Sequence, residues 1–239
     1  MSIAPPPGPG TARQKAGERR IALFGGTFDP IHIGHLAVAR AAERRFHLDE
    51  IHFIPTGRPP HKRRRGMASY ADRYAMVALA CADHPRFIPS LAESGADHSG
   101  RETYYSVDTI RHFKQKFHGA DAHLYFLLGA DSFLDIPTWK DYETLLGLCD
   151  FIVASRPGFH SNALRLVIPP ELFARPGSAD APLDPRAIAL RRTTIYLLDT
   201  VSSHVSATEV RHRLDANQSI HGLVPPRVEE YITKQALYR

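Results

Sequence analysis

Short apolar runs alternate with segments of helical spacing over most of this chain, and this alternation is the feature that most restricts its fold. The apolar runs lie at residues 21–26, 51–55, 86–89, 123–129, 151–155 and 193–198. Apolar residues at helical spacing predict helices over residues 34–46, 69–82, 104–117 and 138–148. Strands of near-continuous apolar character that alternate with helices are typical of a parallel sheet covered on both faces. We therefore expect an α/β fold, a doubly wound parallel sheet with helices on both faces.

Three segments depart from this alternation. Residues 1–18 are rich in Pro and Gly and are interpreted as a disordered tail, which leaves residues 19–239 as the folded domain. Residues 156–192 are expected to be irregular apart from one helix. Ser206 and Glu209 have the spacing of a capping box, which predicts a helix over residues 206–214, and a Pro-initiated helix follows at residues 225–237. These two helices form a small C-terminal helical part.

The composition disfavours a membrane or exported protein. The longest uncharged apolar stretches, such as residues 122–130, are well short of the roughly 18 residues that span a bilayer. The N-terminal residues lack the apolar region of a secretory signal. Cys81 and Cys149 both lie in apolar periodic segments, where a free thiol acts as a small hydrophobic group. We therefore expect a reducing, cytoplasmic location.

The formal net charge of +5 raises the question of nucleic-acid binding. Residues 1–20 hold four basic residues and one acidic residue, and residues 58–65 hold five basic residues, so the rest of the chain is slightly acidic. The basic character is local, and aromatic residues do not interleave with it. A nucleic-acid partner is therefore disfavoured, and Arg63, Arg64 and Arg65 are interpreted as a solvated charge run.

The stretch GGTFDPIHIGH at residues 25–35 follows the first apolar run and contains the strongest candidate site. Gly25 and Gly26 allow a sharp turn and close approach of a ligand, and the helix that follows directs its free N–H groups toward that turn. His32 and His35 add imidazole donors at the same helix start. The spacings of the dinucleotide fingerprint and of the P-loop are both absent. The combination predicts an anion site of another kind, and a metal site is disfavoured because no third ligand accompanies the two histidines.

Two other segments carry polar residues at positions where α/β proteins bind ligands. A second helix start carries the hydroxyls of Ser206 and Thr208 and the guanidinium of Arg211, a combination that suits an anion. The alternative is that Ser206 only caps the helix and that Arg211 is solvated. Asp131 follows the run at 123–129, at the carboxyl end of an expected strand, where it either contacts a ligand or caps the next helix.

The motifs of this chain resemble those of the bacterial nicotinate-nucleotide adenylyltransferases, a family of the nucleotidylyltransferase superfamily. The resemblance runs from about residue 20 to residue 239 and implies a Rossmann-like fold. Besides residues 25–35, it is carried in order by TYYSVDTI, FLLGADSFLDIPTWKDYETLL, ASRPG, VSATEVRHRL and LVPPRVEEYI. Two departures occur: Ser106 stands where the family commonly has Thr, and Ala207 where it commonly has Ser.

The resemblance implies a role for each candidate residue. The ATP phosphates would be held by Gly25, Gly26, Thr27, Phe28, His32, His35, Ser206, Thr208 and Arg211. Gly129 and Asp131 would contact the adenosine, and Trp139 would stack on the nicotinate ring. Tyr105 and Ser106 would bind the nicotinate carboxylate, and Lys62 would lie near the phosphates of the mononucleotide or of ATP. His32, His35 and Arg211 would be the catalytic residues.

The implied reaction is adenylyl transfer from ATP, with Mg²⁺, to nicotinate mononucleotide, which gives deamido-NAD and pyrophosphate in NAD biosynthesis. Another nucleotidylyltransferase, such as a phosphopantetheine adenylyltransferase or a cytidylyltransferase, would share both anion sites but would not require Trp139. A basic nucleic-acid-binding module remains the alternative from a different class. A homo-oligomer is compatible with the sequence.

Overall fold

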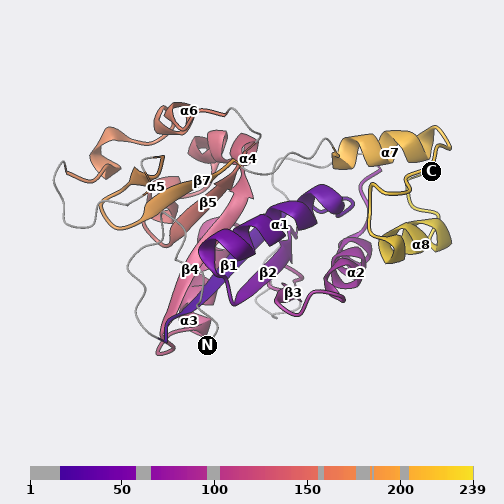
Figure 1. Ribbon diagram of the computed structural model, residues 1–239, viewed down its shortest axis with the longest axis horizontal. Coiled ribbons are helices and arrows are strands. Elements are labelled where there is room, and N and C mark those ends of the chain that lie inside the picture. Colours follow the sequence, from indigo (N-terminus) through magenta and orange to yellow (C-terminus); the bar gives the residue numbers. More distant parts are fainter. Residues whose placement is uncertain are drawn as a thin grey trace, which may run out of the picture.

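The computed structural model describes residues 17–57, 66–95, 103–155, 159–175, 184, 186–199 and 205–238 (Figure 1). The tail predicted for residues 1–18 therefore lies outside the described residues except for Gly17 and Glu18. Lys62 and the run Arg63, Arg64 and Arg65 also lie outside them. None of the described helices is long and apolar enough to cross a membrane.

A seven-stranded sheet forms the centre of the molecule, in the order β3-β2-β1-β4-β5-β7-β6. The strands are β1 (Arg19–Gly26), β2 (Glu50–Pro55), β3 (Phe87–Pro89), β4 (Ala122–Gly129), β5 (Asp150–Ala154), β6 (Ile188–Ala189) and β7 (Thr194–Leu198). All neighbouring pairs are parallel except β6 with β7. The order reverses at β1, which lies between β2 and β4. The predicted α/β fold with a doubly wound sheet is confirmed.

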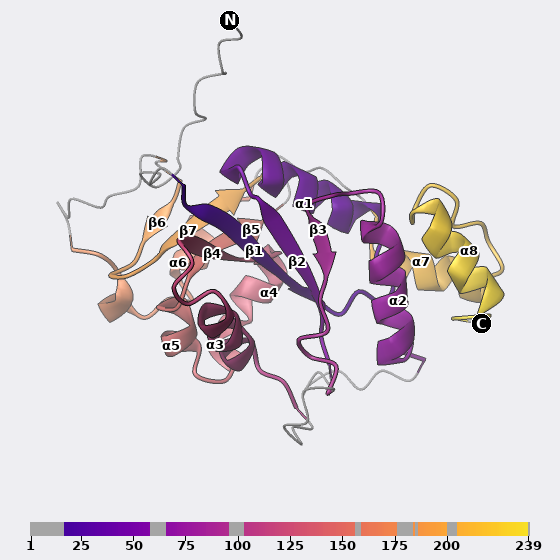
Figure 2. The same ribbon diagram turned by 90° about the horizontal axis from the view of Figure 1, so that it is seen from below.

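Helices cover both faces of this sheet (Figure 2). They are α1 (Ile33–Phe46), α2 (Tyr70–Cys81), α3 (Ser106–Lys116), α4 (Ala130–Leu134), α5 (Tyr142–Leu146), α6 (Asn162–Arg165), α7 (Ala207–Asp215) and α8 (Pro226–Lys234), with 3-10 turns η1 (Ile136–Thr138) and η2 (Pro170–Leu172). Each face has its own buried cluster: α1, α2, α7 and α8 contribute to one, and α3, α4, α5 and α6 to the other. Along β1, Ala22 and Phe24 belong to the first cluster and Ile21 and Leu23 to the second. The strand thus alternates between two cores, which is why its sequence is continuously apolar over residues 21–24.

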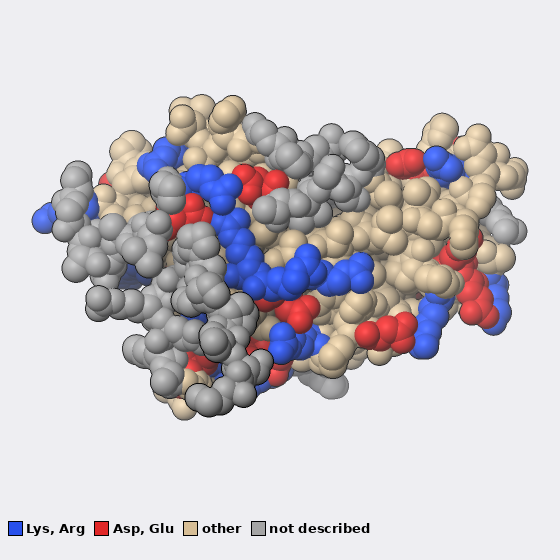
Figure 3. Space-filling view, viewed as in Figure 1, with Lys and Arg blue, Asp and Glu red and all other residues tan. Residues whose placement is uncertain are grey.

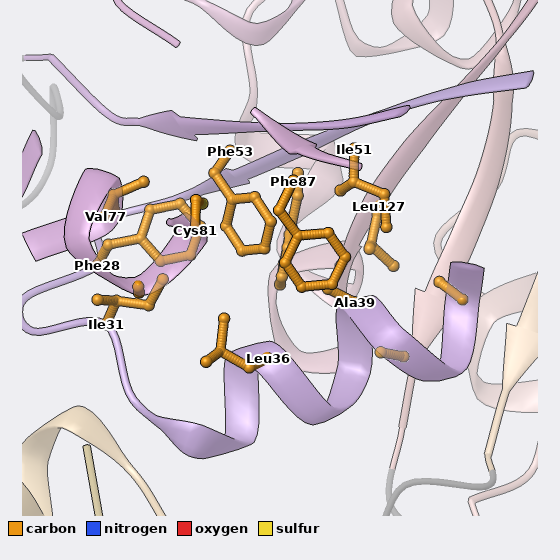
Figure 4. Close-up of a cluster of buried hydrophobic side chains, with 14 of the residues drawn as sticks. Phe28, Ile31, Leu36, Ala39, Ile51, Phe53, Val77, Cys81, Phe87 and Leu127 are labelled. Atoms are coloured by element: carbon orange, nitrogen blue, oxygen red, sulfur yellow. The ribbon is translucent and has the colours of Figure 1, made fainter. Parts of the chain in front are cut away.

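The cluster beneath α1 fixes the segment that joins β1 to this helix (Figure 4). Phe28 and Ile31 are 2% and 0% exposed, and both point into the space between α1 and the sheet. The Phe28 ring lies edge-on to Phe24, with ring centroids 5.5 Å apart, and 5.8 Å from Phe53. Full burial of one such ring stabilises the fold by roughly 1.5–3 kcal/mol. The glycine- and histidine-rich turn is therefore anchored by apolar residues of its own.

Two sequence predictions are wrong in part. The helix predicted over residues 138–148 is instead α5 alone, preceded by α4 and η1. Trp139 is extended and Asp141 has a left-handed φ of 48°, so one continuous helix over residues 138–148 cannot form. Residues 156–192, expected to be irregular apart from one helix, also contain η2 and the edge strand β6, whose two residues are too short to show a period.

The C-terminal helices α7 and α8 lie beyond α2 at one end of the molecule (Figure 1). Tyr231 of α8 donates its hydroxyl to Asp72 Oδ1 of α2 at 2.9 Å. The N–H of Ile33, the first residue of α1, donates to the carbonyl of Leu223 at 3.0 Å. The small C-terminal helical part predicted from the sequence is thus packed against the start of the fold.

Candidate active site

Two adjoining cavities open where the strand order reverses. The larger has a volume of about 810 Å³ and the smaller about 420 Å³, and both are lined by Gly25, Gly26, Thr27 and Ser132. Gly25 and Gly26 end β1, and Gly129 ends β4, so the cavities lie at the carboxyl ends of these strands. This is the position at which open α/β sheets bind ligands.

The first predicted anion site lies along the wall of the larger cavity. His32 is the N-cap of α1, and its backbone N–H donates to His35 Nδ1 at 3.3 Å. The two imidazole rings lie 3.7 Å apart between centroids and both line the cavity, together with Gly34. Phe28, with a left-handed φ of 49°, turns the chain from β1 toward these rings. The structure thus brings the glycine pair and the two histidines to one cavity, and their role as a site stays a prediction.

Burial keeps both histidines neutral. Desolvation lowers the pKa of His32 to about 4, and desolvation together with the neighbouring His32 lowers the pKa of His35 well below its ordinary value. Because His35 Nδ1 accepts a hydrogen bond, the proton of its neutral ring is assigned to Nε2. His32 Nδ1 is buried and has no hydrogen-bond partner within the described part of the chain. Neutral rings with free polar positions suit a ligand that brings hydrogen-bonding oxygens.

The second predicted anion site lines the same cavity as the first. Ser206 caps α7 by accepting the Glu209 N–H at 3.1 Å, as the capping-box spacing predicted. Arg211 Nη2 donates to Thr208 Oγ1 at 3.1 Å, and Arg211 Nη1 donates to the Asp29 carbonyl at 2.5 Å. The guanidinium is thus connected to both motifs, which are 182 positions apart in the chain. Ser206, Thr208 and Arg211 all line the larger cavity with His32 and His35.

The end of β4 supplies another part of this cavity. Gly129 and Asp131 line it, with Asp131 in the first turn of α4, as do Ala154 and Ser155 at the end of β5. A Cβ added at Gly129 would meet nothing within 4 Å, so this stretch of the wall is open.

The smaller cavity brings together the three residues expected around a pyridine ring. Tyr105 is the N-cap of α3, Ser106 is its first residue, and Trp139 faces them from beyond η1. The indole lies edge-on to Phe126, with centroids 6.3 Å apart. Trp139 is therefore held beside the cavity as part of its wall.

The structure adds residues that the sequence reasoning did not identify. In the smaller cavity, Glu93 is 7% exposed, accepts the Gly57 N–H at 3.1 Å and accepts the Thr109 hydroxyl at 2.8 Å, and burial raises its pKa. Lys140 Nζ lies 4.4 Å from the centroid of the Tyr105 ring, at the same cavity. In the sequence, the only indication that Lys140 belongs to this cavity was its position directly after Trp139.

Asp29 was also missed, although it stands inside the first motif. It is 4% exposed, and its Oδ1 accepts the Ala68 N–H at 3.1 Å and the Tyr238 hydroxyl at 2.7 Å. Its Oδ2 lies 3.8 Å from Arg211 Nη1. A carboxylate within an otherwise apolar and glycine-rich motif was the signal, because a buried carboxylate requires partners.

Two helix starts that line one cavity at the reversal point of a doubly wound sheet, with an aromatic-walled cavity beside them, are typical of a nucleotide-binding α/β protein. The comparisons with known proteins identify the family. Residues 23–213 match the model of the cytidylyltransferase-like family, and the chain belongs to this family.

Individual similar proteins indicate which members of this family the chain resembles. The chain is 40% identical over 220 residues to a probable nicotinate-nucleotide adenylyltransferase of Moorella thermoacetica, with 92% of each chain covered. It is 39% identical over 223 residues to a protein of the same name from Thermoanaerobacter sp., covering 93% of this chain and 95% of that one. A structure of Plasmodium falciparum nicotinic acid mononucleotide adenylyltransferase complexed with NaAD has a TM-score of 0.68 and 21% identity, covering 92% of this chain and 98% of that one, which supports the fold. The resemblance inferred from the motifs is confirmed.

Proposed function

We propose that this protein transfers the adenylyl group of ATP to nicotinate mononucleotide, which yields deamido-NAD and pyrophosphate. The observation that carries the proposal is the lining of one cavity by His32, His35 and Arg211, and its continuation past Gly25 and Gly26 into the cavity of Trp139. A triphosphate and a pyridine mononucleotide would then meet at the shared wall. The names of the similar bacterial proteins support this choice of substrates.

In this reaction, a phosphate oxygen of the mononucleotide attacks the α-phosphorus of ATP, and the bond from that phosphorus to the bridging oxygen of pyrophosphate breaks. The nucleophile is already an anion, so no side chain needs to remove a proton. Catalysis then rests on alignment and on stabilisation of the charge that develops on the phosphate oxygens. His32 and His35 would donate to these oxygens as neutral imidazoles, and Arg211 would supply the positive charge.

ATP would enter as its magnesium complex. Within the described ranges, no group of three or more His, Cys, Asp or Glu side chains is arranged to hold a metal ion. The ion would therefore be carried chiefly by the phosphate oxygens of the nucleotide, as part of the substrate. His32, His35, Thr208 and Arg211 would donate hydrogen bonds to the phosphate oxygens of the same nucleotide.

The smaller cavity would bind the nicotinate part of the mononucleotide. Trp139 offers an aromatic face, and the first N–H groups of α3, from Ser106 onward, offer donors to a carboxylate. Lys140 adds a positive charge at this cavity, with its Nζ 3.6 Å from Asp108 Oδ2. Ser106 in place of Thr keeps both a hydroxyl and a backbone donor. Lys62 stays a prediction for the phosphates.

The test is pyrophosphate release by the purified protein with ATP, Mg²⁺ and one acceptor at a time. We expect turnover with nicotinate mononucleotide and less with nicotinamide mononucleotide, and none with phosphopantetheine. Turnover with phosphopantetheine alone would assign the protein to another branch of the family. Absence of turnover with every acceptor, in protein that binds ATP, would contradict adenylyl transfer.

The nucleic-acid alternative receives less support from the described surface. Figure 3 shows Lys and Arg side chains in a band across the middle of the face on which α1 lies, with acidic side chains beside it. Arg40, Arg44 and Arg45 belong to α1, but Arg45 pairs with Asp184 at 2.5 Å. Arg86, the residue before β3, pairs with Glu43 of α1 at 3.1 Å. The chain's own carboxylates thus neutralise part of this positive charge.

A further inference from the structure

The segment after α8 returns to the first motif. Ala236 has a left-handed φ of 49°, and the Leu237 N–H donates to the Ile232 carbonyl at 3.1 Å. These two features turn the chain back at the end of the helix. The partly buried ring of Tyr238 packs against the cluster beneath α1 and α2, and its hydroxyl donates to Asp29 Oδ1 at 2.7 Å. The two residues are 209 positions apart.

Tyr238 donates its hydrogen bond to the carboxylate of Asp29, and this carboxylate is the group that would compete with an anionic ligand for Arg211. Asp29 Oδ1 is occupied by the Ala68 N–H and the Tyr238 hydroxyl, while Oδ2 is 3.8 Å from Arg211 Nη1. That separation allows electrostatic attraction but exceeds a hydrogen bond. Arg211 Nη1 donates instead to the Asp29 carbonyl, a weaker acceptor than a carboxylate.

We propose that Tyr238 is a positioning residue of the ATP site, which acts through Asp29 to keep Arg211 available to phosphate. Its hydroxyl holds the carboxylate turned toward the backbone of Ala68 and away from a close ion pair with the guanidinium. Without this hydroxyl, Asp29 is free to rotate toward Arg211 and to form a charge-assisted hydrogen bond with it. Phosphate would then have to displace that bond. This inference depends on the proposed function only in taking a nucleoside triphosphate as the ligand.

Tyr231 provides a matched control. Its hydroxyl also donates to a carboxylate, Asp72 Oδ1, at 2.9 Å, and this hydrogen bond connects α8 with α2. Its ring likewise packs against the cluster beneath α1 and α2. Neither Tyr231 nor Asp72 lines the larger cavity, whereas Asp29 does. A purely structural role of the C-terminal segment therefore predicts similar effects of Tyr231→Phe and Tyr238→Phe, and the positioning role predicts different ones.

The experiment measures ATP affinity by calorimetry in the presence of Mg²⁺, and the KM values for ATP and nicotinate mononucleotide, for wild type and both variants. A hydrogen bond to a charged group is worth enough to change an equilibrium about tenfold. We expect Tyr238→Phe to weaken ATP binding about tenfold, to raise the KM for ATP similarly and to leave the KM for the mononucleotide unchanged. Tyr231→Phe should leave all three at the wild-type values.

A double-mutant cycle with Arg211→Ala tests the route of the effect. Because Tyr238 acts through Arg211, adding Tyr238→Phe to Arg211→Ala should weaken ATP binding no further. Equal losses in both tyrosine variants, or full additivity in the cycle, would overturn the proposal. The binding measurement needs no acceptor and therefore tests this inference separately from the proposed reaction. A wild-type protein that binds ATP but releases no pyrophosphate would refute the reaction, and the ATP affinities of the variants would still decide the inference.

Discussion

Acidification tests the physical state assigned to His32. The side chain is 7% exposed, and burial lowers its pKa to about 4, whereas an imidazole in the unfolded chain titrates near its ordinary value of about 6.5. Between these two values the unfolded state binds a proton that the folded state does not. His32 therefore has no effect on pH dependence above about pH 6.5, and it destabilises the fold increasingly as the pH falls toward 4. The gap between the two pKa values corresponds to about 3 kcal/mol of unfolding free energy.

The assay is urea unfolding of wild type and His32→Gln at several values between about pH 7 and about pH 4. Gln keeps a hydrogen-bonding side chain but does not titrate, so wild type should lose up to about 3 kcal/mol more than the variant over this range. The difference includes the repulsion between protonated His32 and His35, because that repulsion disappears with the variant. His112→Gln removes a histidine that is exposed on α3 and controls for the loss of one titratable group. Parallel declines of wild type and His32→Gln would refute the assignment of a buried neutral imidazole.

Three further predictions concern the proposed reaction. His35→Ala should lower kcat by about 10²–10³ with little change in the KM for the mononucleotide, as measured by pyrophosphate release, and wild-type turnover would exclude a role as phosphate donor. Gly129→Ala should change the urea midpoint of unfolding little, because the added Cβ meets nothing within 4 Å. The same substitution should weaken ATP binding, because the proposed nucleotide lies against this wall of the larger cavity. An unchanged ATP affinity by calorimetry would place the nucleotide elsewhere. Lys140→Met should reduce the preference for nicotinate over nicotinamide mononucleotide about tenfold in kcat/KM, and an unchanged ratio would show that the α3 donors alone select the carboxylate.

The parts of the fold that the sequence predicted are those whose residues follow a long, regular pattern. Buried strands such as β1 and β4 have continuous apolar runs, at residues 21–24 and 124–128, because they contact a core on each face. The start of α7 was predicted because Ser206 and Glu209 form a local hydrogen bond whose partners are close in the chain. The single helix over residues 138–148 was wrong because the apolar spacing does not report the extended backbone of Trp139 or the left-handed backbone of Asp141. β6 has two residues, too few for any period.

The same distinction between local sequence patterns and contacts between distant segments applies to the candidate site. Residues within contiguous motifs, such as His32 and His35, were predicted together, and the structure places them on one wall. The meeting of Arg211 with the first motif was expected only through the family resemblance, since spacing cannot show which helix starts face each other. Glu93 gave no signal, because an isolated acidic residue in a loop is usually solvated, and only the fold brings it against Gly57 and Thr109.

The buried charges around Asp29 explain why the nucleotide site depends on residues far from it in the chain. A carboxylate that is 4% exposed needs hydrogen-bond donors, and the motif itself offers none to it; the donors come from Ala68 before α2 and from Tyr238 after α8. Arg73, 1% exposed, binds the same turn from α2 by donating to the Thr27 carbonyl at 2.8 Å. The conformation of the turn between β1 and α1 is therefore set by α2 and the C-terminal segment as well as by the two elements that it joins. Asp29 lines the larger cavity and is not among the residues that line the smaller one, so substitution of Tyr238 should alter ATP affinity before it alters the smaller cavity.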